Sequence, residues 1–142
     1  MEAYLGRALI TRTLALDLAG FPAGPLVARP GPVQAIQGIE YVARDGTTAS
    51  IAAYQTRTIL EGAEIWPVPG QTWPLPAHDH VAPVTLTWRA GYGDTADTVP
   101  HAIRQGILRV AGGLYDGRAP DTPAVPETTR TILYPYRVPR LV

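Results

Sequence analysis

Alternating apolar and polar residues mark two stretches of the chain as half-buried strands. Residues 84–90 alternate along their whole length, and one face carries Val84, Leu86, Trp88 and Ala90. In residues 9–18 the apolar face is interrupted at Arg12, and its members are Ile10, Leu14, Leu16 and Leu18. A period of two residues is the period of a β-strand, so both stretches are predicted to lie in sheets with one covered face.

The segment between these two strands predicts further short strands and a hairpin. Residues 33–43 are rich in apolar residues, and the alternation breaks at Gly38, which indicates a bulge or a bend. Asp45 and Gly46 then form a strong hairpin signal, and residues 48–52 are expected to return along the preceding strand. Additional strands are expected at residues 54–59 and 63–66.

Residues 67–83 carry five prolines and no periodic pattern. A loop of this length is uncommon in a compact domain. We expect it to be either packed by its own Trp73 or used for contact with another molecule.

Helical spacing is found at one long segment and at the start of the chain. Residues 100–115 place one apolar stripe at helical intervals, with Pro100 expected at the first helical position. Gly112 and Gly113 weaken this helix by about 1 kcal/mol each relative to Ala. Residues 1–6 are typical of a last helical turn, with Gly6 in the place of a C-terminal cap.

The C-terminal part of the chain lacks a regular pattern. Residues 117–127 are rich in Pro, Asp and Thr and are expected to form a linker or an exposed loop. Residues 131–142 are apolar and aromatic, and Pro135 and Pro139 argue against a regular helix or a central strand there. We therefore expect an extended contact arm at 131–142, following a single domain at 1–130.

Together these patterns predict an α+β fold. Its core would be an antiparallel, sandwich-like arrangement of short strands, with a main helix at about 100–115. The 142 residues suffice for one cored domain, and 15 prolines with 14 glycines suit short strands joined by turns.

The charge of the chain gives no general drive toward nucleic acid or anionic membranes. Twelve basic residues, all of them Arg, balance twelve acidic ones, and the arginines are dispersed along the sequence. No stretch approaches 18 apolar residues, so we expect a soluble protein with no membrane partner. The absence of Cys excludes thiolate catalysis, disulfides and Cys-based metal sites.

The residues with catalytic chemistry form no convincing site. His78, Asp79 and His80 could contribute to a metal centre, but ligands at positions i and i+2 of a loop need a further partner that the sequence does not indicate. An exposed loop tip is the simpler interpretation. Ser50 is the single serine of the chain, and His101 at a helix start has no identifiable partner. The sequence therefore predicts a protein that is not an enzyme and needs no metal or cofactor.

Several segments, taken in order, resemble the head–tail connector (adaptor) proteins of tailed phages, a family found in siphophages, prophages and gene transfer agents. The resemblance spans nearly the whole chain. Its segments are residues 2–10, 32–46, 70–74, 84–93, 99–108 and 134–137. Family members usually carry N-terminal helices ahead of a segment similar to residues 2–10, and this chain begins at that segment.

The resemblance implies a ring, expected to be of twelve copies, beneath the portal of a virion or phage-like particle that is assembled in the bacterial cytoplasm. The implied partners are the portal protein, a tail stopper or terminator protein, and DNA that passes through the lumen without sequence-specific binding. The candidate contacts between subunits or with the portal are Trp73, Tyr134, Tyr136, Arg137, Arg140 and Leu141. A ring of identical copies requires two different complementary faces on each subunit.

A different class of protein also fits part of the pattern. Trp66 or Trp73 could form the stacking platform of a ligand-binding β-module, for example a carbohydrate-binding domain. An exposed Trp73 in a concave face would favour this alternative.

Overall fold

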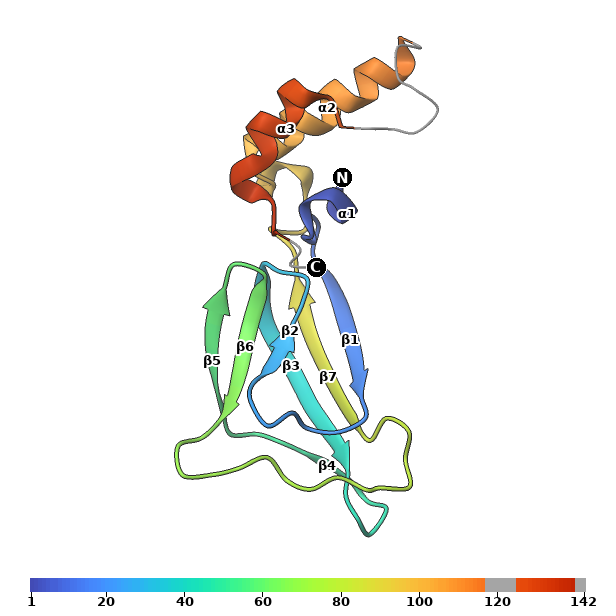
Figure 1. The fold of residues 1–142 in the computed structure, drawn as a ribbon, viewed down its shortest axis with the longest axis vertical. Coiled ribbons are helices and arrows are strands. Elements are labelled where there is room, and N and C mark those ends of the chain that lie inside the picture. Colours follow the sequence, from blue (N-terminus) through green and yellow to red (C-terminus); the bar gives the residue numbers. More distant parts are fainter. Residues whose placement is uncertain (117–124, 140–142) are drawn as a thin grey trace.

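The computed structural model describes residues 1–116 and 125–139. Two antiparallel sheets form the larger part of the molecule, and the helices stand at one end of them (Figure 1). The first sheet has the strand order β1-β7-β3-β4, and the second has the order β2-β6-β5. The first sheet contains β1 (Arg12–Leu18), β3 (Val33–Val42), β4 (Thr48–Ser50) and β7 (Val84–Ala90), and the second contains β2 (Leu26–Ala28), β5 (Tyr54–Ile59) and β6 (Gly62–Pro67). The predicted α+β class and the sandwich-like antiparallel core are confirmed.

Strand β7 forms the centre of the fold, as its alternation predicts. It pairs with β1 on one side and with β3 on the other, and all four of its apolar residues are buried. The cluster between the two sheets consists of Ala8, Leu26, Ala28, Ile39, Ile65, Leu86, Trp88 and Ala90. Because large buried side chains contribute about 1.5–3 kcal/mol each, this cluster is the main source of stability for the sandwich.

The first strand is shorter and more exposed than its pattern predicts. It begins at Arg12 instead of residue 9. Leu14 and Leu18 pack against the core, whereas Ile10 and Leu16 are 41% and 38% exposed. The reason is position: β1 lies at the edge of its sheet and has a neighbouring strand on one side only.

The predicted irregularity and the predicted hairpin are both present in β3. The register of β3 against β7 shifts between Ile36 and Gly38, as expected for a bulge. After β3, the Gly46 N–H donates to Ala43 O at 2.9 Å, and Gly46 takes a φ of 82°. This is the three-residue hairpin loop in which a turn is followed by one left-handed residue. Only Gly46, and not Asp45, therefore takes a positive φ.

The helical end begins with α1 (Glu2–Leu5), capped by Gly6 at φ 68°, as predicted. The 3₁₀ turn η1 (Ala96–Thr98) and the main helix α2 (His101–Tyr115) follow β7. The expected apolar stripe of α2 is only partly covered. Ile103 and Gly106 are buried, but Ile107 and Leu114 are 38% and 50% exposed, because the C-terminal end of α2 extends past α3 (Figure 1).

The predicted extended arm is shorter than residues 131–142. Helix α3 (Glu127–Leu133) and the 3₁₀ turn η2 (Tyr134–Tyr136) occupy its first half, and extended backbone begins at Arg137. Pro135 does not prevent this arrangement, because a proline is tolerated in the first turn of a helix, where its missing N–H has no partner to lose. Arg140 and Leu141 lie outside the described residues.

Helix α3 packs against α2 and completes a second core. This cluster contains Leu5, Leu9, Val99, Ile103 and Leu133. Since Leu133 is fully buried, the boundary expected between residues 130 and 131 falls inside a packed helix. Of the predicted loop at 117–127, residues 117–124 lie outside the described part and Glu127 already belongs to α3. No helix within the described ranges is long and apolar enough to cross a membrane.

Candidate functional site

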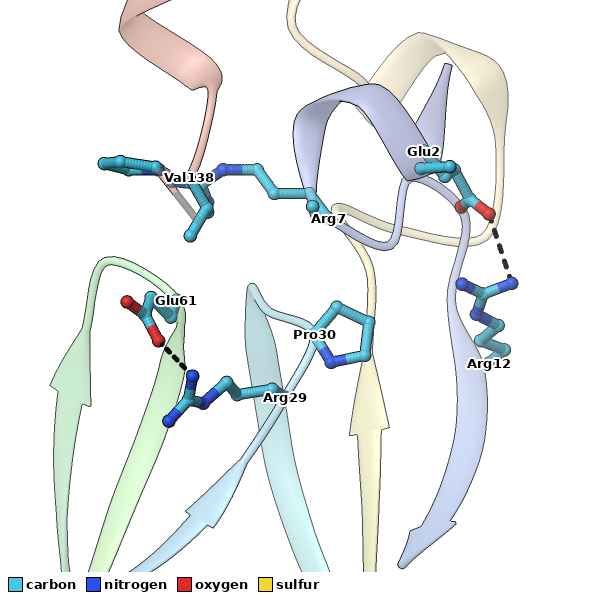
Figure 2. Close-up of a pocket in the computed structure, with 10 residues that line it drawn as sticks. Glu2, Arg7, Arg12, Arg29, Pro30, Glu61 and Val138 are labelled. Carbon is cyan, nitrogen blue, oxygen red and sulfur yellow. Dashed lines mark ion pairs between the residues drawn. The ribbon is translucent and has the colours of Figure 1, made fainter. Parts of the chain in front are cut away.

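The sheets and the helical end meet at a cleft of about 830 Å³, here called the junction cleft (Figure 2). Four segments far apart in the sequence form its walls: α1 and the residues after it, the turn after β2, the β5–β6 turn, and the segment after η2. The lining residues are Glu2, Ala3, Gly6, Arg7, Arg12, Arg29, Pro30, Glu61, Val138 and Pro139.

Glu2 fixes the angle between α1 and β1. Its backbone oxygen accepts the N–H of the capping residue Gly6 at 2.8 Å. Its carboxylate accepts the N–H of Leu9 at 2.7 Å and pairs with the guanidinium of Arg12 at 3.1 Å. One acidic side chain at a helix start thus satisfies a backbone donor and an arginine on the following strand.

Arg7 joins the start of the chain to its C-terminal segment. Its Nε donates to the carbonyl oxygen of Tyr136 at 2.7 Å. Nearby, the N–H of Val138 donates to Leu5 O at 2.9 Å. In Figure 2 the side chain of Arg7 points across the cleft toward the segment that carries Val138.

The opposite wall is held by one ion pair and by two closely packed glycines. Arg29 and Glu61 are 2.7 Å apart, and the N–H of Gly31 donates to Glu61 O at 2.8 Å. A side chain at Gly62 would collide with the carbonyl oxygen of Ala28. Glycine is therefore required where the β5–β6 turn touches the end of β2.

Three arginines and two glutamates line the junction cleft. Both glutamates are already paired, through Arg12 and Arg29. The third arginine, Arg7, is bound to the carbonyl oxygen of Tyr136. All three arginines of the cleft therefore hold its walls together within the chain.

Three of the sequence-predicted contact residues lie together beside the junction. Tyr134 is 76% exposed, and the Arg137 guanidinium lies 5.1 Å from the centre of the Tyr4 ring. Tyr136 is half-buried against the second core. A groove of about 400 Å³, here called the Tyr134 groove, is lined by Leu60, Tyr134, Pro135, Arg137 and Pro139.

Trp73 is remote from these residues and has an internal role. Its ring stacks on Phe21 with centroids 5.2 Å apart and an interplanar angle of 10°. Its Nε1–H donates to the carbonyl oxygen of Gly24 at 3.0 Å. Of the two expectations for residues 67–83, packing by Trp73 is the one observed.

The histidine cluster forms no metal centre in the described structure. His78, Asp79 and His80 are exposed, and the ring Nε2 of His78 lies 3.2 Å from a guanidinium nitrogen of Arg44. Residues 1–116 and 125–139 hold no group of three side chains that could bind a metal ion.

Among the residues that the structure describes, Asp45 is the carboxyl group with a clearly displaced pKa. The hydroxyl and the backbone N–H of Thr47 both donate to Asp45 Oδ1, at 2.6 and 2.9 Å. These bonds hold the pKa of Asp45 below its usual range. Because Asp45 lies in the β3–β4 turn, this effect belongs to the hairpin.

The two tryptophans of the carbohydrate alternative differ in exposure, because Trp73 is partly buried. Trp66 is 40% exposed, and its Nε1–H donates to Glu64 at 3.3 Å. One face of the Trp73 ring is covered by Phe21, while Trp66 and Trp73 both line a depression of about 660 Å³.

Sequence reasoning missed the residues that build the junction: Glu2, Arg7, Arg29 and Glu61. Arg7 and its partner Tyr136 are 129 residues apart, and no periodic pattern connects charged residues over such a separation. The available signal was their position beside turn residues, since Arg29 precedes Pro30 and Glu61 precedes Gly62.

The chain is similar in structure to chains from gene transfer agent (GTA) particles. One comes from the neck of a native GTA particle with C12 symmetry, with a TM-score of 0.79, 20% identity, and coverage of 99% of this chain and 77% of that chain. A second comes from the virion of a native GTA particle, with a TM-score of 0.78, 20% identity, and coverage of 99% and 72%. A third comes from the neck of an empty GTA particle with C6 symmetry, with a TM-score of 0.78, 20% identity, and coverage of 99% and 73%.

No protein-family model matches the sequence. A comparison with curated proteins also gives no match. At 20% identity, the structural similarity establishes a shared fold.

Proposed function

We propose that the chain is a structural subunit in the neck of a tailed-phage-like particle, where it acts as a head–tail connector. The single observation that carries this proposal is the fold. Over 99% of its length the chain superimposes on a chain from the neck of a GTA particle, with a TM-score of 0.79. Fold similarity alone does not transmit a function, so the surfaces of the molecule must also suit this role.

The surface features support a role in assembly instead of catalysis. The junction cleft carries two partly exposed arginines, Arg12 and Arg29. The Tyr134 groove exposes aromatic and apolar side chains beside Arg137. Exposed aromatic residues together with Arg are enriched at the centres of protein–protein interfaces. The described residues offer no comparable gathering of acid–base or metal-binding side chains.

In the proposed assembly the chain forms a ring beneath the portal and joins it to the tail stopper or terminator protein. Similar chains come from necks computed with C12 and with C6 symmetry, and both symmetries are compatible with a ring of twelve. DNA would pass through the lumen without sequence-specific contacts, in keeping with the zero net charge and the dispersed arginines. The particle would be assembled in the cytoplasm of the bacterial host.

Native mass spectrometry of the full chain, alone and with the portal protein of the same particle, tests the proposal. We expect a closed ring, or a stoichiometric complex with the portal, and electron microscopy of particles should place it in the neck. A strictly monomeric chain with no affinity for the portal would count decisively against the connector. Binding in a glycan array, through Trp66, would instead favour the carbohydrate-binding module.

A further inference from the structure

The second half of α2 is apolar on a face that the described residues, 1–116 and 125–139, leave uncovered. Leu108 and Tyr115 are 63% and 93% exposed, and the small exposed residues Ala111 and Gly112 lie between them at helical spacing. The positions i, i+3, i+4 and i+7 place all four on one side of the helix. We call this surface the α2 end face.

This face differs from the stripe that faces the second core. Ile103 is buried on the core side, while Leu114 is half-exposed on the same side. The second half of α2 is therefore apolar on two sides. A helix of this kind in a folded protein is normally buried, so the α2 end face is expected to be covered in an assembly.

The Tyr134 groove has complementary properties. Its walls are apolar and aromatic, with Leu60 56% and Tyr134 76% exposed. Its volume of about 400 Å³ is in the range that accepts large side chains of a partner. Truncating an aromatic side chain at an interface weakens binding most when that side chain fills such a pocket.

The charges at the two surfaces are opposite in sign. Asp116 follows directly after the α2 end face, at the negative end of the helix dipole, and has no ion pair within residues 1–116 and 125–139. Arg137 lies at the rim of the Tyr134 groove and is exposed. An apolar surface ending in a carboxylate thus matches an apolar groove rimmed by a guanidinium.

The two surfaces also lie in different parts of the molecule. In Figure 1 the C-terminal end of α2 is at the upper right, and the β5–β6 turn that carries Leu60 is at the left, at the end of the sheets. A surface that fits a different surface on an identical copy forms a head-to-tail contact, which closes into a ring when the rotation allows it.

We propose that the α2 end face of one copy docks into the Tyr134 groove of the next copy, with Asp116 beside Arg137. This inference deepens the proposed function, because it names the contact on which the ring would depend. Both surfaces of the interface then belong to copies of this chain. Leu108 and Tyr115 of one copy supply the apolar anchors, and Leu60 and Tyr134 of the next copy receive them.

Cross-linking between copies tests the docking directly, because the chain has no native cysteine. One copy carries Ala111→Cys on the α2 end face, and the other carries Leu60→Cys in the groove. A mixture treated with a short bis-maleimide should give a covalent dimer joined between positions 111 and 60. In the matched control the second copy carries Ser50→Cys, at an exposed position on β4, in place of Leu60→Cys. This mixture should give only the small amount of dimer that random collisions produce.

Further variants test the contacts themselves. Tyr115→Ala should lower the yield of the 111–60 dimer about tenfold, as expected for the loss of a central aromatic anchor. Asp116→Arg should lower it up to about fivefold, and Arg137→Asp in the partner copy should restore it. A yield equal to the Ser50→Cys control would overturn the docking, and a charge swap that restores nothing would overturn the Asp116–Arg137 pairing.

The outcomes separate this inference from the proposed function. Rings seen in particles without a 111–60 cross-link would refute the docking and leave the connector intact. A specific 111–60 cross-link in a protein that neither closes into rings nor binds a portal would leave the contact standing and refute the connector.

Discussion

The Nε of Arg7 donates a hydrogen bond of 2.7 Å to the carbonyl oxygen of Tyr136, across 129 residues of sequence. The bond joins the segment after α1 to Tyr136, the last residue of η2, and so to the segment that follows η2. Both segments line the junction cleft, so its shape depends on this contact. The cleft is therefore a product of tertiary structure, and variants of its residues have predictable effects.

Replacing Arg7 by Ala should lower the free energy of unfolding by about 1.5 kcal/mol, the usual size of a hydrogen bond with a charged donor. Thermal or urea unfolding measures the change. Arg109→Ala is the matched control, because Arg109 is exposed on α2 and its loss should change stability by less than about 0.5 kcal/mol. Equal effects of the two variants would contradict a structural role for the Arg7–Tyr136 bond.

Replacing Leu133 by Ala should destabilise the helical end by about 3 kcal/mol. Leu133 is fully buried, and its side chain packs directly over Gly106 of α2, so the truncation leaves a cavity in the second core. Chemical denaturation gives the free energy, and hydrogen exchange should show α3 opening before the sheets. Leu75→Ala makes the same change at an exposed site of the loop after β6 and should have an effect below about 0.5 kcal/mol.

Replacing Gly62 by Ala should cost about 3 kcal/mol, at the upper end of the range for overpacking, because the new methyl group collides with backbone and not with a flexible side chain. The control is Gly20→Ala, since no atom lies within contact distance of a side chain at Gly20. Thermal unfolding distinguishes the two. A Gly62→Ala protein as stable as the control would show that β2 and the β5–β6 turn do not pack as described.

Replacing Thr47 by Val should raise the pKa of Asp45 toward its usual range, because the hydroxyl bond is lost while the backbone N–H still donates. In the native protein the lowered pKa stabilises the folded state fully above the ordinary carboxyl pKa of about 3.9, and this contribution disappears as the pH falls through the lower folded value. An NMR titration of the Asp45 carboxyl measures the pKa. Thr58→Val on β5 should leave it unchanged.

Local sequence patterns predicted several strands and left-handed glycines of the fold correctly. Residues 84–90 and 54–59 were predicted within the observed limits of β7 and β5, and Gly6 and Gly46 take the left-handed conformations expected of them. In each case the prediction depends only on residues that are neighbours in the sequence.

The same reasoning failed where distant packing decides the outcome. Pro135 and Pro139 suggested an extended arm from residue 131, but α3 continues to Leu133, because burial against α2 stabilises the helix and Pro135 begins the following turn. The apolar pattern of α2 was correct, yet it could not tell which side chains would remain exposed.

The sequence by itself determined the class of fold, the positions of most strands and of the main helix, and the absence of cysteine chemistry. These properties follow from periodicity and from the intrinsic preferences of single residues. Only the tertiary structure decided the junction and the exposed surfaces. The contacts of Arg7 with Tyr136 and of Arg29 with Glu61, and the separate placement of the α2 end face and the Tyr134 groove, depend on how distant segments meet. Such contacts produce no periodic pattern in the sequence.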